Sequence, residues 1–181
     1  MKYEKNSSSR RKTMSYTKCN CTRCGGHSFE FKKVHEETNF LLTYPDEKAF
    51  SIEEEKSFLS RKEESAAEVQ LCAFVGDVIV GLAGVSTIGA REKIRHRAEL
   101  GVSLEKDYGS LGIGSALTAA CIECATKAGF RQLELEVVGD NRNAIALYKK
   151  MGFVEYGRNP RGFVSRSSVY QELILMRLEL R

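Results

Sequence analysis

The chain has 181 residues, of which 42% are hydrophobic and 29% charged, and a formal net charge of +4 at pH 7. This length suits one compact domain. The composition excludes a fibrous repeat, disorder over the whole length and a bundle of membrane helices, so we expect a cytoplasmic protein that does not bind membranes.

The excess positive charge lies at the start of the chain. Residues 1–13 contain five Lys or Arg residues and one Glu, which together account for the whole net charge of +4. The rest of the chain is formally neutral, so a basic face for binding nucleic acid is not expected. We predict that residues 1–13 are a disordered, solvated tail and that residues 14–181 form a single domain.

The six cysteines are expected to be thiols, because cytosolic reductants keep cysteines reduced. One run could hold zinc, with the spacing C-x-C-x2-C-x2-H: Cys19, Cys21, Cys24 and His27. Ordinary structural zinc sites pair two short knuckles across a longer gap, so we favour a strand over residues 16–21 with buried thiols and expect no metal. The other cysteines are expected to be core thiols: Cys72, Cys121 and Cys124.

The first half of the chain predicts two helices followed by three strands. Thr22 is a candidate N-cap for a helix that runs through Val34, and the capping box Ser51-Ile52-Glu53-Glu54 starts a helix to about Arg61. A loop around Pro45 joins these helices. Alternating apolar residues then predict a hairpin of strands 69–75 and 78–86, and a further strand over 96–104.

The second half alternates helices and strands. A glycine-rich loop over 109–114 precedes a helix at 115–128, a strand at 133–137 and a helix at 144–151. Two final strands, 153–157 and 169–178, flank a loop that begins Arg158-Asn159-Pro160. This order of elements predicts an α/β (α+β) protein whose sheet contains both antiparallel hairpins and a parallel crossover.

The loop from Gly109 to Ser115 is the strongest indication of a ligand site. Its spacing is G-x-x-G-x-G, directly before a helix, where glycines allow backbone N–H groups to approach an anion and the helix dipole favours negative charge. The loop does not match the dinucleotide-binding motif G-x-G-x-x-G, because Leu117 stands in place of the third glycine. It does not match a nucleoside triphosphate loop either, because no Lys-Ser/Thr pair follows the glycines. The sequence therefore predicts a phosphate-binding turn of another type.

The chain resembles the GNAT superfamily of acyl-CoA-dependent N-acetyltransferases in two motifs. Gly112, Ile113 and Gly114 match the core of the family's phosphate loop. A second family motif, Asn-x-x-Ala-x-x-Leu-Tyr-x-x-x-Gly-Phe, is complete at Asn141, Ala144, Leu147, Tyr148, Gly152 and Phe153. The resemblance covers residues 66–155 most clearly. It implies a mixed, mostly antiparallel central sheet flanked by helices.

The resemblance also implies roles for individual residues. Pantetheine would bind the backbone of the strand before the loop, at Val102, Ser103 and Leu104. The pyrophosphate would bind the amides of Ser110, Leu111, Gly112, Ile113, Gly114 and Ser115, and a side chain at Gly114 would fill the space of the phosphate. Asn141 would contact the arm of acetyl-CoA, and Tyr148 would donate a proton to the departing thiolate. Gly109 is a departure, since the family usually has Arg or Gln there.

The reaction expected is transfer of the acetyl group of acetyl-CoA to a primary amine, of a small molecule or a protein N-terminus, by direct attack and without a metal. An amine with a pKa near 10.4 costs about 4 to 5 kcal/mol to deprotonate at pH 7, and an α-amine near 7.8 only about 1 kcal/mol, so the first class needs a general base. Our candidate is Glu99, acting through water, with His96 as the reserve.

Two other functions remain open at this stage. One is a noncatalytic acyl-CoA-binding regulatory module, and the other is an interaction protein stabilised by zinc at the first cysteines. The acceptor pocket is expected between residues 36–60 and 157–170, whose composition indicates no particular amine. The last strand could pair across a homodimer.

Overall fold

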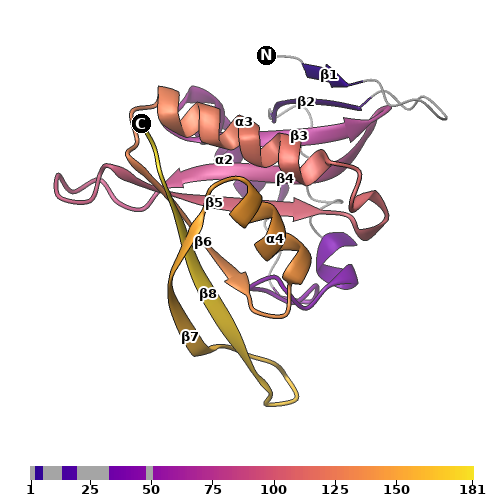
Figure 1. Cartoon of the computed structure of the whole chain (residues 1–181). Helices are drawn as coiled ribbons and strands as arrows, with labels where there is room; N and C mark the ends of the chain where they lie inside the picture. The colour runs from indigo at the N-terminus through magenta and orange to yellow at the C-terminus, as the bar shows by residue number, and fades with distance from the viewer. Residues whose placement is uncertain (1–2, 6–13, 20–32, 48–50) are drawn as a thin grey trace.

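The structure is a computed structural model that describes residues 3–5, 14–19, 33–47 and 51–181. The described residues form an eight-stranded sheet in the order β1-β2-β3-β4-β5-β6-β8-β7. Neighbouring strands are antiparallel, except for the parallel pair β5 and β6. Helices lie on both faces of the sheet (Figure 1). The predicted class, a mixed and mostly antiparallel sheet flanked by helices, is confirmed.

The first half of the chain contributes β1 (Tyr3–Lys5), β2 (Met14–Lys18), α2 (Ile52–Glu64), β3 (Val69–Val75), β4 (Val78–Thr87) and β5 (Arg97–Leu104). Residues 33–37 are also helical, whereas the start of the helix predicted from Thr22 lies outside the described residues. The second half contributes the short helix η2 (Lys106–Tyr108), α3 (Ile113–Lys127), β6 (Gln132–Val138), α4 (Arg142–Lys150), β7 (Val154–Val164) and β8 (Tyr170–Glu179).

The main core lies between the sheet and helices α3 and α4. Alternate residues of the central strands point into it, among them Leu71 and Ala73 of β3 and Leu133 and Leu135 of β6. The residues between them on β3 face α2, where Cys72 and Phe74 join a second cluster around Leu59. Strand β3 is therefore buried on both faces.

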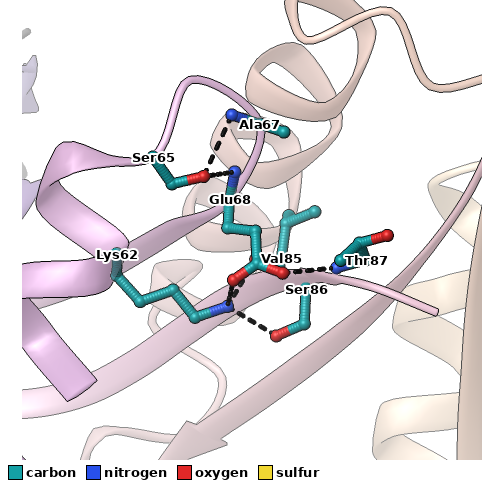
Figure 2. Close-up of polar contacts among 7 residues, drawn as sticks. All are labelled: Lys62, Ser65, Ala67, Glu68, Val85, Ser86 and Thr87. Carbon is teal, nitrogen blue, oxygen red and sulfur yellow. Dashed lines mark hydrogen bonds and ion pairs between the residues drawn. The ribbon is translucent and has the colours of Figure 1, made fainter. Parts of the chain in front are cut away.

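Helix α2 is fixed to the sheet by a buried lysine. The Lys62 ammonium donates to the Val85 carbonyl at 2.9 Å and to Ser86 Oγ at 2.6 Å, and it pairs with the Glu68 carboxylate at 2.9 Å (Figure 2). Glu68 also accepts a hydrogen bond from the Thr87 amide at 2.9 Å. A buried cation needs this full set of partners to offset its lost hydration. At the other end of α2, the predicted capping box is present.

The prediction that the cysteines are thiols is wrong for two of them. Cys19, directly after β2, forms a disulfide with Cys72 of β3, with 5.4 Å between their Cα atoms. The Cys19 amide donates to the Gln70 carbonyl at 2.8 Å, which places the two cysteines side by side on neighbouring strands. Cys19 is therefore not available to the run that could have held zinc, whose other members lie outside the described residues. Cys121 and Cys124 are free, as predicted.

Three further predictions on the strands need correction. The last strand, β8, lies between β6 and β7, so it has no free edge with which to pair across a homodimer as expected. Residues 3–5 of the expected disordered tail form β1 and pair with β2, for example Tyr3 with Tyr16. The loop predicted at Arg158-Asn159-Pro160 is part of β7, which continues to Val164 with a register irregularity between Asn159 and Phe163. Because β7 is an edge strand, Pro160 can occupy it without removing a hydrogen bond from a central ladder.

Candidate active site

The glycine-rich loop has the geometry of an anion-binding turn. Ser110 and Gly112 adopt left-handed backbone conformations, with φ values of 61° and 83°. Gly112 is the N-cap of α3 and offers no side-chain cap, and the first turn of this 15-residue helix contains no acidic residue. The first amides of α3 therefore lack the side-chain acceptor that caps most helices, and an anion can take its place.

The two glycines of the motif have different roles. A Cβ built at Gly112 meets nothing within 4 Å, so this position requires glycine for its left-handed backbone. A Cβ at Gly114 would meet Leu147 Cδ2 of α4 at 3.3 Å. Gly114 therefore allows α3 and α4 to pack closely. The expectation that a side chain at Gly114 would fill the phosphate's space stays a prediction.

The chain that leads into the loop is anchored by one ion pair and two hydrogen bonds. Glu105, which is buried, follows β5 and pairs with the Lys33 ammonium at 2.5 Å. The Glu105 amide donates to the Val80 carbonyl at 3.0 Å, and the Lys106 amide donates to Glu37 Oε2 at 2.8 Å. Helical residues 33–37 thus hold the segment that leads from β5 into the glycine-rich loop. The sequence pattern did not indicate this contact between distant segments.

Strands β5 and β6 pair over a short distance and then separate. Their parallel ladder runs from Arg97 opposite Gln132 to Glu99 opposite Glu134, whereas β5 continues to Leu104 and β6 to Val138. The predicted pantetheine residues Val102, Ser103 and Leu104 lie on this second part of β5, opposite Ala83, Leu82 and Gly81 of β4. Beyond Glu99 the parallel ladder between β5 and β6 does not continue, so the two strands diverge along these residues.

Asn141 has a structural role at the start of α4. It is the N-cap of the helix, and its side-chain oxygen accepts a hydrogen bond from the Ala144 amide at 3.2 Å. This bond explains the spacing between Asn141 and Ala144 in the motif, because a cap oxygen reaches the amide three residues on.

Tyr148 of α4 is a buried tyrosine in the main core. Its ring packs against Phe153 with 5.8 Å between centroids. Burial, with a smaller contribution from the neighbouring Cys121 thiol, raises the pKa of Tyr148 to about 12. The phenol therefore carries its proton throughout the neutral range, so a proton is available there for a hydrogen bond or for acid catalysis.

Glu99 and Tyr148 lie on opposite faces of the sheet. Ala98 and Leu100 belong to the main core together with Tyr148, and Glu99 between them points to the other face, where it is exposed. His96, the reserve base, is exposed directly before β5. A route between the two faces requires a place where neighbouring strands do not pair, and the β5–β6 ladder ends at Glu99 itself.

Three polar side chains form a cluster at the end of this ladder, and the sequence did not predict it. Arg97 binds Glu134 through two hydrogen bonds, Nε to Oε1 at 2.5 Å and Nη2 to Oε2 at 2.7 Å. Tyr156 Oη donates to Glu134 Oε2 at 3.3 Å. The Arg97 guanidinium is the main cause that lowers the pKa of Glu134, although burial opposes it. The sequence shows that charged residues alternate along the two strands. It does not show that these strands are neighbours in the sheet.

The two segments expected to shape the acceptor pocket contact one another. Arg166, in the turn between β7 and β8, pairs with Asp46 at 2.7 Å, and its guanidinium lies over the Tyr44 ring at 4.1 Å. The Arg166 amide also donates to Tyr44 Oη at 3.0 Å. Gln171 Nε2 donates to the Asn39 carbonyl at 3.4 Å. These contacts join residues 36–47 to the β7–β8 hairpin.

Two classes of feature are absent from the part of the chain that the structure describes. No group of three or more His, Cys, Asp or Glu side chains in the described ranges is arranged to hold a metal ion. None of the described helices is both long and apolar enough to cross a membrane.

Solved structures with this fold are numerous. An acetyltransferase of the GNAT family from Streptococcus pneumoniae superposes with a TM-score of 0.88 and 27% sequence identity, covering 92% of this chain and 99% of that one. A putative acetyltransferase from Salmonella typhimurium, solved with its cofactor acetyl-CoA, has a TM-score of 0.82 and 16% identity over 93% of this chain and 94% of that one. The second likeness is one of fold alone.

Curated relatives match over shorter regions. A mycothiol acetyltransferase from Amycolatopsis mediterranei is 45% identical over 53 residues, 26% of this chain and 18% of that protein. An uncharacterized protein from Mycobacterium leprae is 30% identical over 107 residues, 59% of this chain and 28% of that protein. The chain thus spans less than a third of the length of these two relatives.

The model of the acetyltransferase (GNAT) family matches residues 31–153, which contain the glycine-rich loop, the diverging strands β5 and β6, and Tyr148. This match covers more than half of the sequence, and its bounds include both motifs on which the resemblance was based. The chain belongs to the GNAT family of acetyltransferases.

Proposed function

We propose that this protein transfers the acetyl group of acetyl-CoA to a primary amine, of a small molecule or of a peptide N-terminus, by direct attack. One observation supports the proposal most strongly: the β5–β6 ladder ends at Glu99. Tyr148 lies on one face of the sheet and the Glu99 carboxylate on the other, and the strands stop pairing at this position. An acid and a base on opposite sides of a sheet can serve one reaction only through such an opening.

The residues present fit acetyl-CoA. Ser110 to Gly112 are exposed, the first turn of α3 has no acid, and a Cβ at Gly112 would project into open space. These are the properties that a pyrophosphate requires of a helix N-terminus. The backbone of Val102 to Leu104 would hold the pantetheine arm, which is extended and carries amides that can pair with a strand edge. When bound, acetyl-CoA supplies the thioester at which a C–N bond forms and the C–S bond breaks.

Glu99 is the group that we assign to the amine proton. A protonated amine cannot attack, and removing its proton at pH 7 costs about 4 to 5 kcal/mol for a pKa near 10.4. An exposed carboxylate at the end of the ladder can accept this proton through one water molecule. For an α-amine near pKa 7.8 the cost is about 1 kcal/mol, so the role of Glu99 would be smaller.

Tyr148 is the group that we assign to the departing sulfur. Since its pKa is about 12 and that of an ordinary thiol is about 8.5, complete transfer of the phenol proton to a thiolate would cost about 5 kcal/mol. A hydrogen bond from the phenol to the developing thiolate has no such cost and stabilises its charge. Tyr148 therefore acts mainly as a hydrogen-bond donor that makes the thiolate a better leaving group.

The test is release of thiol from acetyl-CoA in the presence of spermidine, a lysine derivative and a short peptide with a free N-terminus, each measured separately. Turnover with at least one amine, together with its acetylated product by mass spectrometry, supports the proposal. Binding of acetyl-CoA without turnover on any of several dozen primary amines would favour the noncatalytic acyl-CoA-binding module instead.

A further inference from the structure

Arg97 shares one face of the sheet with two carboxylates. Arg97 and Glu99 are two positions apart on β5, and their side chains share the face opposite the core, about 7 Å apart along the strand. Glu134 is the ladder partner of Glu99 on β6 and shares that face, so it lies diagonally across from Arg97. Either carboxylate could pair with the guanidinium.

The structure shows Arg97 paired with Glu134. Both oxygens of Glu134 accept from the guanidinium, at 2.5 and 2.7 Å, in the two-point geometry that makes Arg–carboxylate pairs strong. The Glu134 side chain is only 9% exposed, and Tyr156 donates a further hydrogen bond to it. Glu99 is exposed and competes poorly, because water weakens a surface ion pair.

This choice of partner matters for Glu99. A carboxylate that is paired with a guanidinium has its lone pairs occupied and is a weaker base. While Arg97 is bound to Glu134, it cannot bind Glu99 in the same way. We propose that Glu134 is a positioning residue that sequesters Arg97 and so keeps the Glu99 carboxylate available to the amine. This inference rests on the proposed function, in which Glu99 accepts the amine proton.

A simpler role would be a clasp that holds β5 to β6 at the last pair of the ladder. The two roles differ in what happens when Arg97 is removed. If the ion pair only holds β5 to β6, then Arg97→Gln, Glu134→Gln and the double variant should all lower kcat to the same extent. Sequestration is harmed only by Glu134→Gln, because only this variant leaves a free arginine beside Glu99.

The first experiment does not depend on the acceptor. The ¹⁵N–¹H signal of Arg97 Nε is followed by NMR in the full chain, since a hydrogen bond to a carboxylate slows its exchange with water. We expect a protected signal in the wild type, in Glu99→Gln and in Glu134→Gln, and loss of protection only in the double variant Glu134→Gln/Glu99→Gln. Loss of protection in Glu134→Gln alone would overturn the proposal, because Arg97 would then not turn to Glu99.

The second experiment measures kcat for thiol release with spermidine. We expect Glu134→Gln to lower kcat about tenfold, which corresponds to about 1.4 kcal/mol, and Glu134→Gln/Arg97→Gln to recover most of this loss. Glu136→Gln is the matched control, because Glu136 is an exposed carboxylate two residues further along β6 on the same face. A double variant no faster than Glu134→Gln would contradict sequestration and indicate a clasp.

Failure of the proposed function gives a different pattern from failure of this inference. If Glu99→Gln retains the wild-type kcat, Glu99 is not the base, whatever Arg97 does. If Glu99→Gln lowers kcat but removal of Arg97 does not rescue Glu134→Gln, the base assignment stands and the sequestration is wrong.

Discussion

The sharpest prediction concerns the phenol oxygen of Tyr148. Tyr148→Phe removes this oxygen and keeps the ring that packs against Phe153 at 5.8 Å, so the core should retain its packing. A hydrogen bond to a charged group contributes about 1.5 to 3 kcal/mol. Because each 1.36 kcal/mol is a factor of ten in rate, kcat should fall roughly 10- to 150-fold.

The assay is thiol release at saturating acetyl-CoA, with the Kd of acetyl-CoA measured in parallel by calorimetry. We expect the Kd to change less than about threefold, because the phenol is assigned to the transition state rather than to ground-state binding. With the pKa of Tyr148 at about 12, deprotonation of the phenol should not limit kcat below pH 10. A kcat within a factor of two of the wild type would refute the assignment of Tyr148 to the leaving group.

Three further predictions follow from the loop, the disulfide and the ion pair. Gly112→Ala should cost about 1 to 2 kcal/mol of stability in urea melts, since an L-residue is strained at φ 83°, and it should also weaken acetyl-CoA binding; Gly114→Ala should mainly disturb packing, because its Cβ would meet Leu147. Cys72→Ser opens a loop closed over 53 residues and should lower the free energy of unfolding by up to about 4 kcal/mol, with no effect of reductant on the variant. The pKa of Glu134 is lower in the folded protein than in the unfolded chain, where it is about 4.3. The ionised Glu134 therefore stabilises the fold above pH 4.3, and this stabilisation is lost as the pH falls through the folded pKa. In Glu134→Gln the free energy of unfolding should depend less on pH in the acid range.

Each of these has a contradicting result. Equal losses of acetyl-CoA affinity in the two glycine variants would mean that Gly114 also faces the phosphate. Wild-type protein whose urea midpoint does not respond to reductant would contradict the disulfide. Identical acid-unfolding curves for the wild type and Glu134→Gln would show that the Arg97–Glu134 pair adds no pH-dependent stability.

Features encoded by neighbouring residues could be predicted from the sequence. The capping box at Ser51 and the hairpin of β3 and β4 follow from local spacing and are confirmed. The strand, loop and helix around Gly112 were also predicted, although α3 begins at Ile113, two residues earlier than expected. Periodicity and turn residues are sufficient for such elements because their hydrogen bonds join residues close in the chain.

Features that depend on distant partners could not be predicted. Cys19 and Cys72 are 53 residues apart, and nothing in their local pattern indicates that β2 and β3 are neighbours. The pairing of Arg97 with Glu134 likewise requires β5 and β6 to be parallel neighbours with a known register. Gly114 was assigned to phosphate binding by motif alone, whereas its contact with Leu147 follows from the packing of two helices.

The most direct test of the account is a calorimetric titration of the wild-type protein and of Gly112→Ala with acetyl-CoA. We expect binding of one acetyl-CoA per chain with a Kd of about 1 to 100 µM, in the range of typical KM values, and weaker binding to the variant. No detectable heat with the folded wild-type protein at millimolar acetyl-CoA, at two temperatures, would contradict the cosubstrate site and with it the proposed acetyl transfer.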